Sequence, residues 1–98
     1  DFSSADISNS DFTQCNFTAS SFEHCTAKNT VFITSILKGS SFEHANINAA
    51  MMTGADLVEV NFSDCNMFGV DLGGATFGKN FFAQANLDRT IIKEWQPS

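Results

Sequence analysis

Residues 42–62, FEHANINAAMMTGADLVEVNF, place a large apolar residue at every fifth position. Outward from this stretch, the same spacing runs from Phe2 to Ile92. Eighteen of its nineteen positions are large and apolar, and Ala27 is the exception. One residue type also returns at an unbroken interval of twenty, as Phe2, Phe22, Phe42, Phe62 and Phe82. A short fixed period of this kind indicates a repeat architecture.

A period of five fits neither regular secondary structure. An α-helix advances about 100° per residue, so every fifth residue would scatter around the cylinder. A flat strand alternates with period two and would send successive large residues to opposite faces. A chain that turns a corner every five residues presents them all to one axis. Because twenty divided by five is four, the spacing predicts four-sided coils of 20 residues, and nearly five of them.

The position two residues before each large residue is also distinctive. It holds a small or compact residue throughout, with Asn80 as the exception. A second large side chain per pentad would not fit a narrow core at native packing density. We therefore expect the large and the small residue of each pentad to point inward, and the other three positions to face solvent.

Several pentads share a three-residue motif: Ala5-Asp6-Ile7, Cys15-Asn16-Phe17, Ala45-Asn46-Ile47, Ala55-Asp56-Leu57, Cys65-Asn66-Met67 and Ala85-Asn86-Leu87. This pattern resembles the pentapeptide-repeat family. The resemblance implies an all-β fold, the right-handed quadrilateral β-helix, over residues 1–92. Residues 93–98 would then form a C-terminal exit or capping segment. The chain begins in phase with the repeat, so we expect it to be part of a larger protein.

Charge and composition narrow the function classes. The formal net charge is −6, whereas nucleic-acid binding needs clustered Lys and Arg, so we expect no direct nucleic-acid binding. No apolar run is long enough for a membrane span. The three cysteines occupy small inward positions and are predicted to be free thiols, which fits a cytoplasmic location: Cys15, Cys25 and Cys65.

The sequence contains no arrangement that indicates catalysis. A nucleophile needs a base within hydrogen-bond reach and a site that excludes water. The glycines of the fourth coil are not followed by the Lys-Ser/Thr pair of a phosphate-binding loop. We therefore predict no enzyme activity, no catalytic residue and no cofactor.

The tetrapeptide Ser-Phe-Glu-His occurs at 21–24 and again at 41–44. His24 and His44 should therefore stack on the outside, with Asp64 next in the column. Two imidazoles and a carboxylate could hold Zn²⁺. An internal duplication that leaves two solvated histidines is the favoured interpretation, so no metal site is predicted. The same side carries a short acidic stripe, Glu23, Glu43 and Asp64.

The outward positions between residues 31 and 68 depart from the polar rule. They form a candidate interaction patch of Val31, Ile33, Ile36, Met51, Val58 and Phe68. Exposed apolar patches often mark interfaces. The alternative is that β-branched residues simply suit an extended, exposed backbone.

Two functions fit these features. The first is a non-catalytic structural or protein-interaction module with a protein partner, for instance within a bacterial secreted effector delivered to a host cytosol. The second is an acidic DNA mimic that binds DNA gyrase or topoisomerase. It is suggested by a resemblance to quinolone-resistance pentapeptide proteins at Phe12-Thr13-Gln14-Cys15 and Phe22-Glu23-His24-Cys25. A mimic needs carboxylates in rows, whereas these are spread over several sides, so mimicry ranks second. A homodimer through an end of the rod is compatible with either function.

Overall fold

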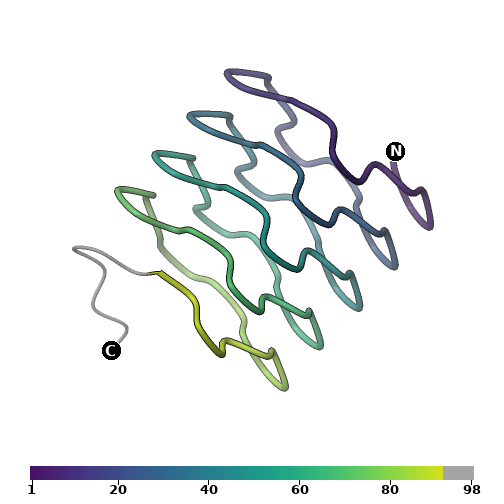
Figure 1. Ribbon diagram of the computed structural model, residues 1–98. Coiled ribbons are helices and arrows are strands. Elements are labelled where there is room, and N and C mark those ends of the chain that lie inside the picture. Colours follow the sequence, from purple (N-terminus) through teal and green to yellow (C-terminus); the bar gives the residue numbers. More distant parts are fainter. Residues whose placement is uncertain (92–98) are drawn as a thin grey trace.

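The computed structural model describes residues 1–91 as a stack of four-sided coils (Figure 1). Ile92, the last residue of the predicted repeat, and the predicted exit segment 93–98 lie outside the described residues. We number the four sides by the large residue at the centre of each in the second coil. The first side is centred on Phe22, the second on Ala27, the third on Phe32 and the fourth on Leu37.

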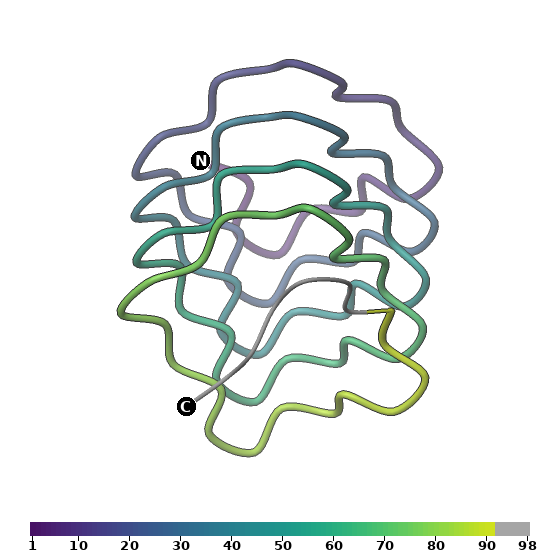
Figure 2. The ribbon, with the colours of Figure 1, turned by 90° about the vertical axis from the view of Figure 1, so that its left-hand side faces the viewer.

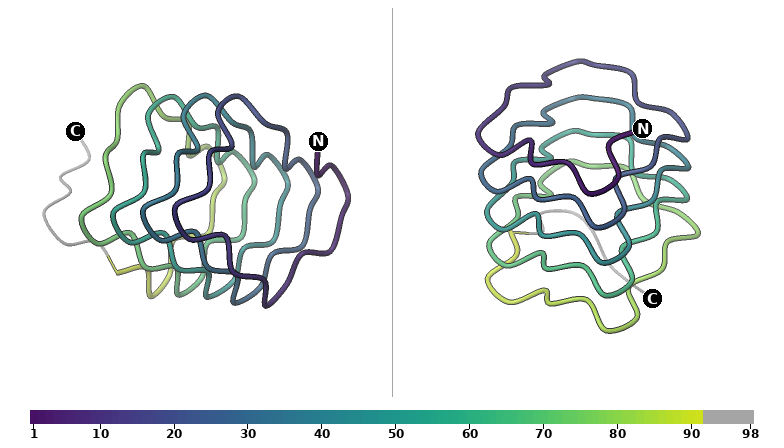
Figure 3. Two further views of the ribbon diagram at one scale, coloured as in Figure 1. Left: turned by 90° about the horizontal axis from the view of Figure 1, so that it is seen from above. Right: turned by 90° about the vertical axis from the view of Figure 1, so that its right-hand side faces the viewer.

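The register is constant along the stack. Parallel bridges join residues twenty positions apart, from Asp6–Thr26 at one end to Asp71–Ile91 at the other. Within residues 1–91 these bridges involve single residues, one in each pentad, and the chain forms no longer strand and no helix. Figures 2 and 3 show the resulting coils, each lying against the next with its corners aligned. A spacing of twenty is therefore the physical register of the fold.

Each pentad satisfies its own backbone N–H groups in a fixed way. In the pentad 55–59, Leu57 and Glu59 donate to carbonyls of the following coil at 2.8 and 2.7 Å. Asp56 donates to the preceding coil at 2.9 Å, and Ala55 closes the turn by donating to Met52 at 3.1 Å. Four of the five N–H groups are thus paired with backbone. The fifth, that of the residue after the large one, needs another acceptor.

A side chain supplies that acceptor. The residue before the large one, which we call the cap position, accepts the fifth N–H through its side-chain Oδ1. The N···Oδ1 distances are 2.9–3.2 Å, and the bond forms an Asx turn. Asp or Asn fills this cap position in ten pentads: Asp1, Asp6, Asp11, Asn16, Asn46, Asp56, Asn61, Asn66, Asp71 and Asn86. The hydrogen bonds from Ser8 lower the pKa of Asp6, and those from Thr13 lower that of Asp11. The Asp/Asn of the repeat motif therefore stabilises the turn by accepting its otherwise unpaired N–H.

The core contains two kinds of inward residue, as the sequence predicted. The phenylalanine column of the first side stacks with centroids 4.5–5.7 Å apart and rings within 16° of parallel. Phe22, Phe42 and Phe62 have no exposed surface. The small residues Ala45 and Ala55 are also buried, which confirms that both positions of the pentad face inward.

Asn80, the exception among the small positions, has a structural role. Its amide nitrogen donates to the carbonyls of Leu57 and Val60, at 2.7 and 2.9 Å, and its Oδ1 accepts from Gly78 N at 2.8 Å. These three bonds stand at an irregular corner, where the regular turn of the other pentads is lost. The larger polar side chain is tolerated because its amide nitrogen and oxygen both have backbone partners at this corner.

Candidate functional site

The candidate interaction patch is built at cap positions. Val31, Ile36 and Met51 occupy the place where most pentads carry Asp or Asn, yet an aliphatic or thioether side chain cannot accept the N–H of the turn. Each of these residues exchanges a hydrogen-bonding cap for exposed apolar surface. Nothing in the core requires this exchange, because the cap side chain points to solvent. The loss of three caps over neighbouring pentads is the clearest departure from the rules of the fold.

These three residues lie close together. Val31 and Met51 are bridge partners on the third side, so one lies directly above the other. Ile33 stands at the turn that leads from Val31 to the fourth side, where Ile36 follows. Ile36 and Met51 are each 40% exposed, against half-burial of Val31 and Ile33. We refer to Val31, Ile33, Ile36 and Met51 as the corner patch.

The other two predicted patch residues lie farther out. The register places Phe68 at the corner where the third side begins, one coil above Asn48, and the structure leaves it half-buried. Val58 is half-buried at the opposite end of the fourth side, in the column that contains Lys38. Phe68 therefore borders the corner patch on its third-side edge, and Val58 belongs to a different corner.

Carboxylates border the corner patch. Asp11 bridges Val31 from below, Asp71 bridges Met51 from above, and Asp56 bridges Ile36. The hydrogen bonds from Thr13 lower the pKa of Asp11 below its ordinary value. The patch is thus an apolar surface with an acidic rim, and Lys38 is the one basic residue near Ile36 in sequence.

Two further exposed apolar residues were not part of the predicted patch. Phe81 is 62% exposed and Ile91 is 46% exposed. Both occupy cap positions, and Ile91 continues the column of Val31 and Met51 beyond Asp71. The signal that would have found them is the same loss of the Asp/Asn cap that defines the corner patch.

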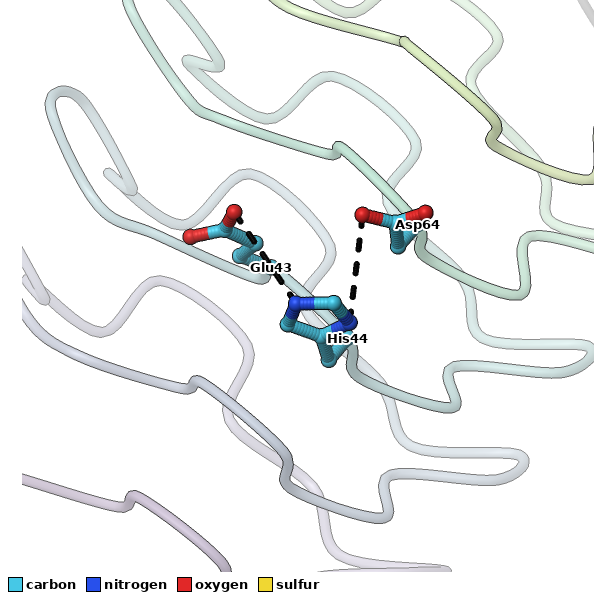
Figure 4. A group of neighbouring side chains, drawn as sticks. All are labelled: Glu43, His44 and Asp64. Carbon is cyan, nitrogen blue, oxygen red and sulfur yellow. Dashed lines mark ion pairs between the residues drawn. The ribbon is translucent and has the colours of Figure 1, made fainter.

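The histidine column of the first side belongs to a second cluster, of which Figure 4 shows His44 with Glu43 and Asp64. The rings of His24 and His44 stack with centroids 4.8 Å apart and planes 14° from parallel. His44 lies between two carboxylates, with Nδ1 3.8 Å from Asp64 Oδ2 and Nε2 4.0 Å from Glu43 Oε2. Of the predicted acidic stripe, Glu23 and Glu43 occupy one column, while Asp64 continues the histidine column.

The interior offers no comparable chemistry. In the part of the chain that the structure describes, every buried side-chain nitrogen or oxygen has a hydrogen-bond partner. The three cysteines are free, and burial raises the pKa of Cys25 to about 11 and shifts that of Cys65 in the same direction. A protonated thiol without solvent access is a poor nucleophile. The two buried thiols, Cys25 and Cys65, therefore do not form a reactive site.

No helix within residues 1–91 has the length and apolar character that crossing a membrane requires.

Comparisons with known proteins agree with this architecture. The model of the pentapeptide repeat region matches residues 1–82. The crystal structure of the pentapeptide repeat protein Rfr23 from the cyanobacterium Cyanothece 51142 is similar over 92% of this chain, with a TM-score of 0.88 and 20% identity. This chain spans 62% of the length of that protein.

Two more distant structures also match. A pentapeptide repeat protein from the Arabidopsis thaliana thylakoid lumen is 24% identical, with a TM-score of 0.49, over 95% of this chain and 68% of that one. QnrB1, a plasmid-mediated fluoroquinolone resistance protein, is 14% identical, with a TM-score of 0.44, over 94% of this chain and 64% of that one. A search of curated proteins gives no match. The predicted right-handed quadrilateral β-helix is confirmed, and the chain belongs to the pentapeptide-repeat family.

Proposed function

We propose that this protein is a non-catalytic interaction module that binds a protein partner through the corner patch. The observation that carries the proposal is the loss of the Asp/Asn cap at Val31, Ile36 and Met51. A hydrogen bond of this kind typically contributes about 1 kcal/mol, so three such losses are costly for the fold alone. Exposed apolar surface at such positions is explained if another molecule covers it.

The rim of the patch indicates the chemistry of the partner. Asp11, Asp56 and Asp71 surround the apolar residues and lie in the same bridge columns. Opposite charges at the rim of an interface favour association and select against acidic partners. The partner should therefore present apolar side chains flanked by Lys or Arg. A setting within a larger protein such as a bacterial effector, and a cytoplasmic or host-cytosol location, remain predictions from the sequence.

A peptide-display selection against the purified chain tests this proposal. We expect enriched peptides to combine apolar residues with flanking Lys or Arg. The double variant Ile36→Asn/Met51→Asn should weaken their binding at least tenfold. Thr26→Asn is the matched control, because it places the same residue at a cap position of the second side, away from the patch. Equal binding by the double variant and the wild type would refute the assignment.

DNA mimicry is the second candidate, supported by the net charge of −6 and by the sequence resemblance of two pentads to quinolone-resistance proteins. The described carboxylates occupy all four sides; for example, Glu43 lies on the first, Asp88 on the second, Asp71 on the third and Asp56 on the fourth. Mimicry predicts that the chain inhibits gyrase supercoiling, less strongly at higher salt. Such inhibition, left unchanged by Ile36→Asn/Met51→Asn, would favour mimicry over the corner patch.

A further inference from the structure

The cluster of Glu43, His44 and Asp64 on the first side has the composition of a metal site. One imidazole nitrogen and one oxygen from each carboxylate lie within 4.8 Å of one another. Ligands placed around a tetrahedral zinc ion at about 2.1 Å are about 3.4 Å apart. The ligand atoms therefore need to approach one another by at most about 1.4 Å around an ion. All three belong to outward positions, so this movement meets no core packing.

The backbone of the cluster is fixed even though its side chains face solvent. His44 and Asp64 occupy equivalent corner positions one coil apart, with φ of 61° and 56°. Their N–H groups donate to the next coil, His44 to Ser63 O at 3.1 Å and Asp64 to Ala83 O at 2.8 Å. The His24 ring also stacks on the His44 ring, which limits its rotation. Two of the three ligands are thus held in register by the solenoid itself.

The charges around the cluster favour a cation. Within residues 1–91, the pentads of the first side contain no lysine or arginine, although they carry Glu23, Glu43 and Asp64. Imidazole is the only base in the cluster, and it offers at most one positive charge against two carboxylates. The present contacts of 3.8 and 4.0 Å are longer than charge-assisted hydrogen bonds. A divalent ion would balance the carboxylates and use the imidazole as a neutral donor.

We propose that Glu43, His44 and Asp64 bind a divalent transition-metal ion, with Zn²⁺ as the preferred ion and water completing its coordination. One nitrogen and two carboxylate oxygens are ligands that zinc accepts, whereas Mg²⁺ and Ca²⁺ prefer sites made of oxygen. The sequence alone favoured solvated histidines, because it shows the column of His24, His44 and Asp64 but not that one ligand atom from each of Glu43, His44 and Asp64 lies within 4.8 Å of the others. The proposed site is independent of the corner patch.

Isothermal titration calorimetry of the full chain with ZnCl₂ tests the proposal. We expect one zinc ion per chain, at least tenfold weaker binding for both His44→Gln and Asp64→Asn, and at least tenfold weaker binding of MgCl₂ to the wild type. His24→Gln is the matched control, since it removes an imidazole from the same column at an equally exposed corner but spares the three ligands. It should change the affinity by less than threefold.

The imidazole resonances in an NMR titration give a second measurement. Those of His44 should shift with zinc at the stoichiometric point, before any change in the backbone spectrum. Absence of binding, unchanged binding in His44→Gln, or an equal loss in His24→Gln would each overturn the ligand assignment. Because the substituted side chains face solvent, unfolding curves of the metal-free variants should match those of the wild type.

Discussion

Phe42→Ala tests the central feature of the fold, the phenylalanine column. Phe42 is fully buried and stacks on both faces, with Phe22 at 4.5 Å and Phe62 at 5.7 Å. Truncation of a buried phenylalanine costs about 3–5 kcal/mol. Because both stacking contacts are lost and the coils on either side hold the cavity open, we expect a cost of about 4–5 kcal/mol, at the upper end of this range.

Phe2→Ala is the matched comparison within the same column. Phe2 is half-buried and has a stacking partner on one face only, Phe22 at 5.0 Å. Solvent can fill the space left by truncation, so the cost should be about 2 kcal/mol. The two variants should then differ by about 2–3 kcal/mol, which is about a 30- to 150-fold difference in the unfolding equilibrium.

Urea denaturation followed by far-UV circular dichroism measures both values. The loss for Phe42→Ala approaches the whole stability of a typical domain, about 5–15 kcal/mol, so Phe42→Leu and Phe2→Leu form a milder second pair with the same expected order. Equal losses at the two positions, in either pair, would refute the idea that each coil is supported by neighbours on both sides. A change in the steepness of the transition would instead show that the coils unfold separately.

Four further predictions concern Asn80, Ala55 and the cysteines. Asn80→Ala should destabilise the fold by about 1–3 kcal/mol in urea denaturation, because the N–H of Gly78 loses its acceptor and the carbonyls of Leu57 and Val60 each lose a side-chain donor. Ala55→Phe should cost at least about 1–3 kcal/mol, visible as a lower melting temperature, because the core has no room for a second large side chain in the pentad. In the native protein at pH 8, a thiol reagent should modify half-buried Cys15 well before Cys25 and Cys65. Stability should also fall as pH rises from about 9 to about 11, because burial raises the pKa of Cys25 from 9.0 to about 11 and the unfolded thiol ionises first.

Two further variants serve as controls for these predictions, and two outcomes would contradict them. Asn86→Ala removes an exposed cap and should cost less than Asn80→Ala, whose side chain bonds to the preceding coil. Cys25→Ala should reduce the loss of stability at alkaline pH. Reaction of all three thiols at one rate in the native state would contradict the inward placement of Cys25 and Cys65. An unchanged melting temperature for Ala55→Phe would contradict the inward placement of Ala55.

The architecture was predictable because the solenoid depends on local spacing. Phe42 and Ala45 show their inward direction through their period alone, since neighbouring coils impose the same requirement on every pentad. Asn80 could be recognised as an exception but not explained. Its hydrogen bonds to Val60 and Gly78 belong to an irregular corner that spacing does not reveal.

The surface was predicted less completely, for a physical reason. Val31 and Met51 could be placed in one column from the register, and Ile36 beside them, because bridges are twenty residues apart. Only the hydrogen bonds of the structure show that these residues occupy the cap position, where Asp or Asn usually accepts the N–H of the turn. Phe81 occupies the same position and also lacks that acceptor. The approach of Glu43 to His44 depends on side-chain rotamers, and no repeat length determines these.

The constant register has a consequence for how such a gene can change in length. Deletion of residues 41–60 would place Asn61 over Ser21 and Phe62 over Phe22, and every later residue would keep its column. Deletion of five residues would instead shift all later pentads by one side and mismatch the phenylalanine column. Insertions and deletions should therefore survive selection chiefly in multiples of twenty codons. The chain can thus lengthen or shorten by whole coils while each surface column keeps its direction.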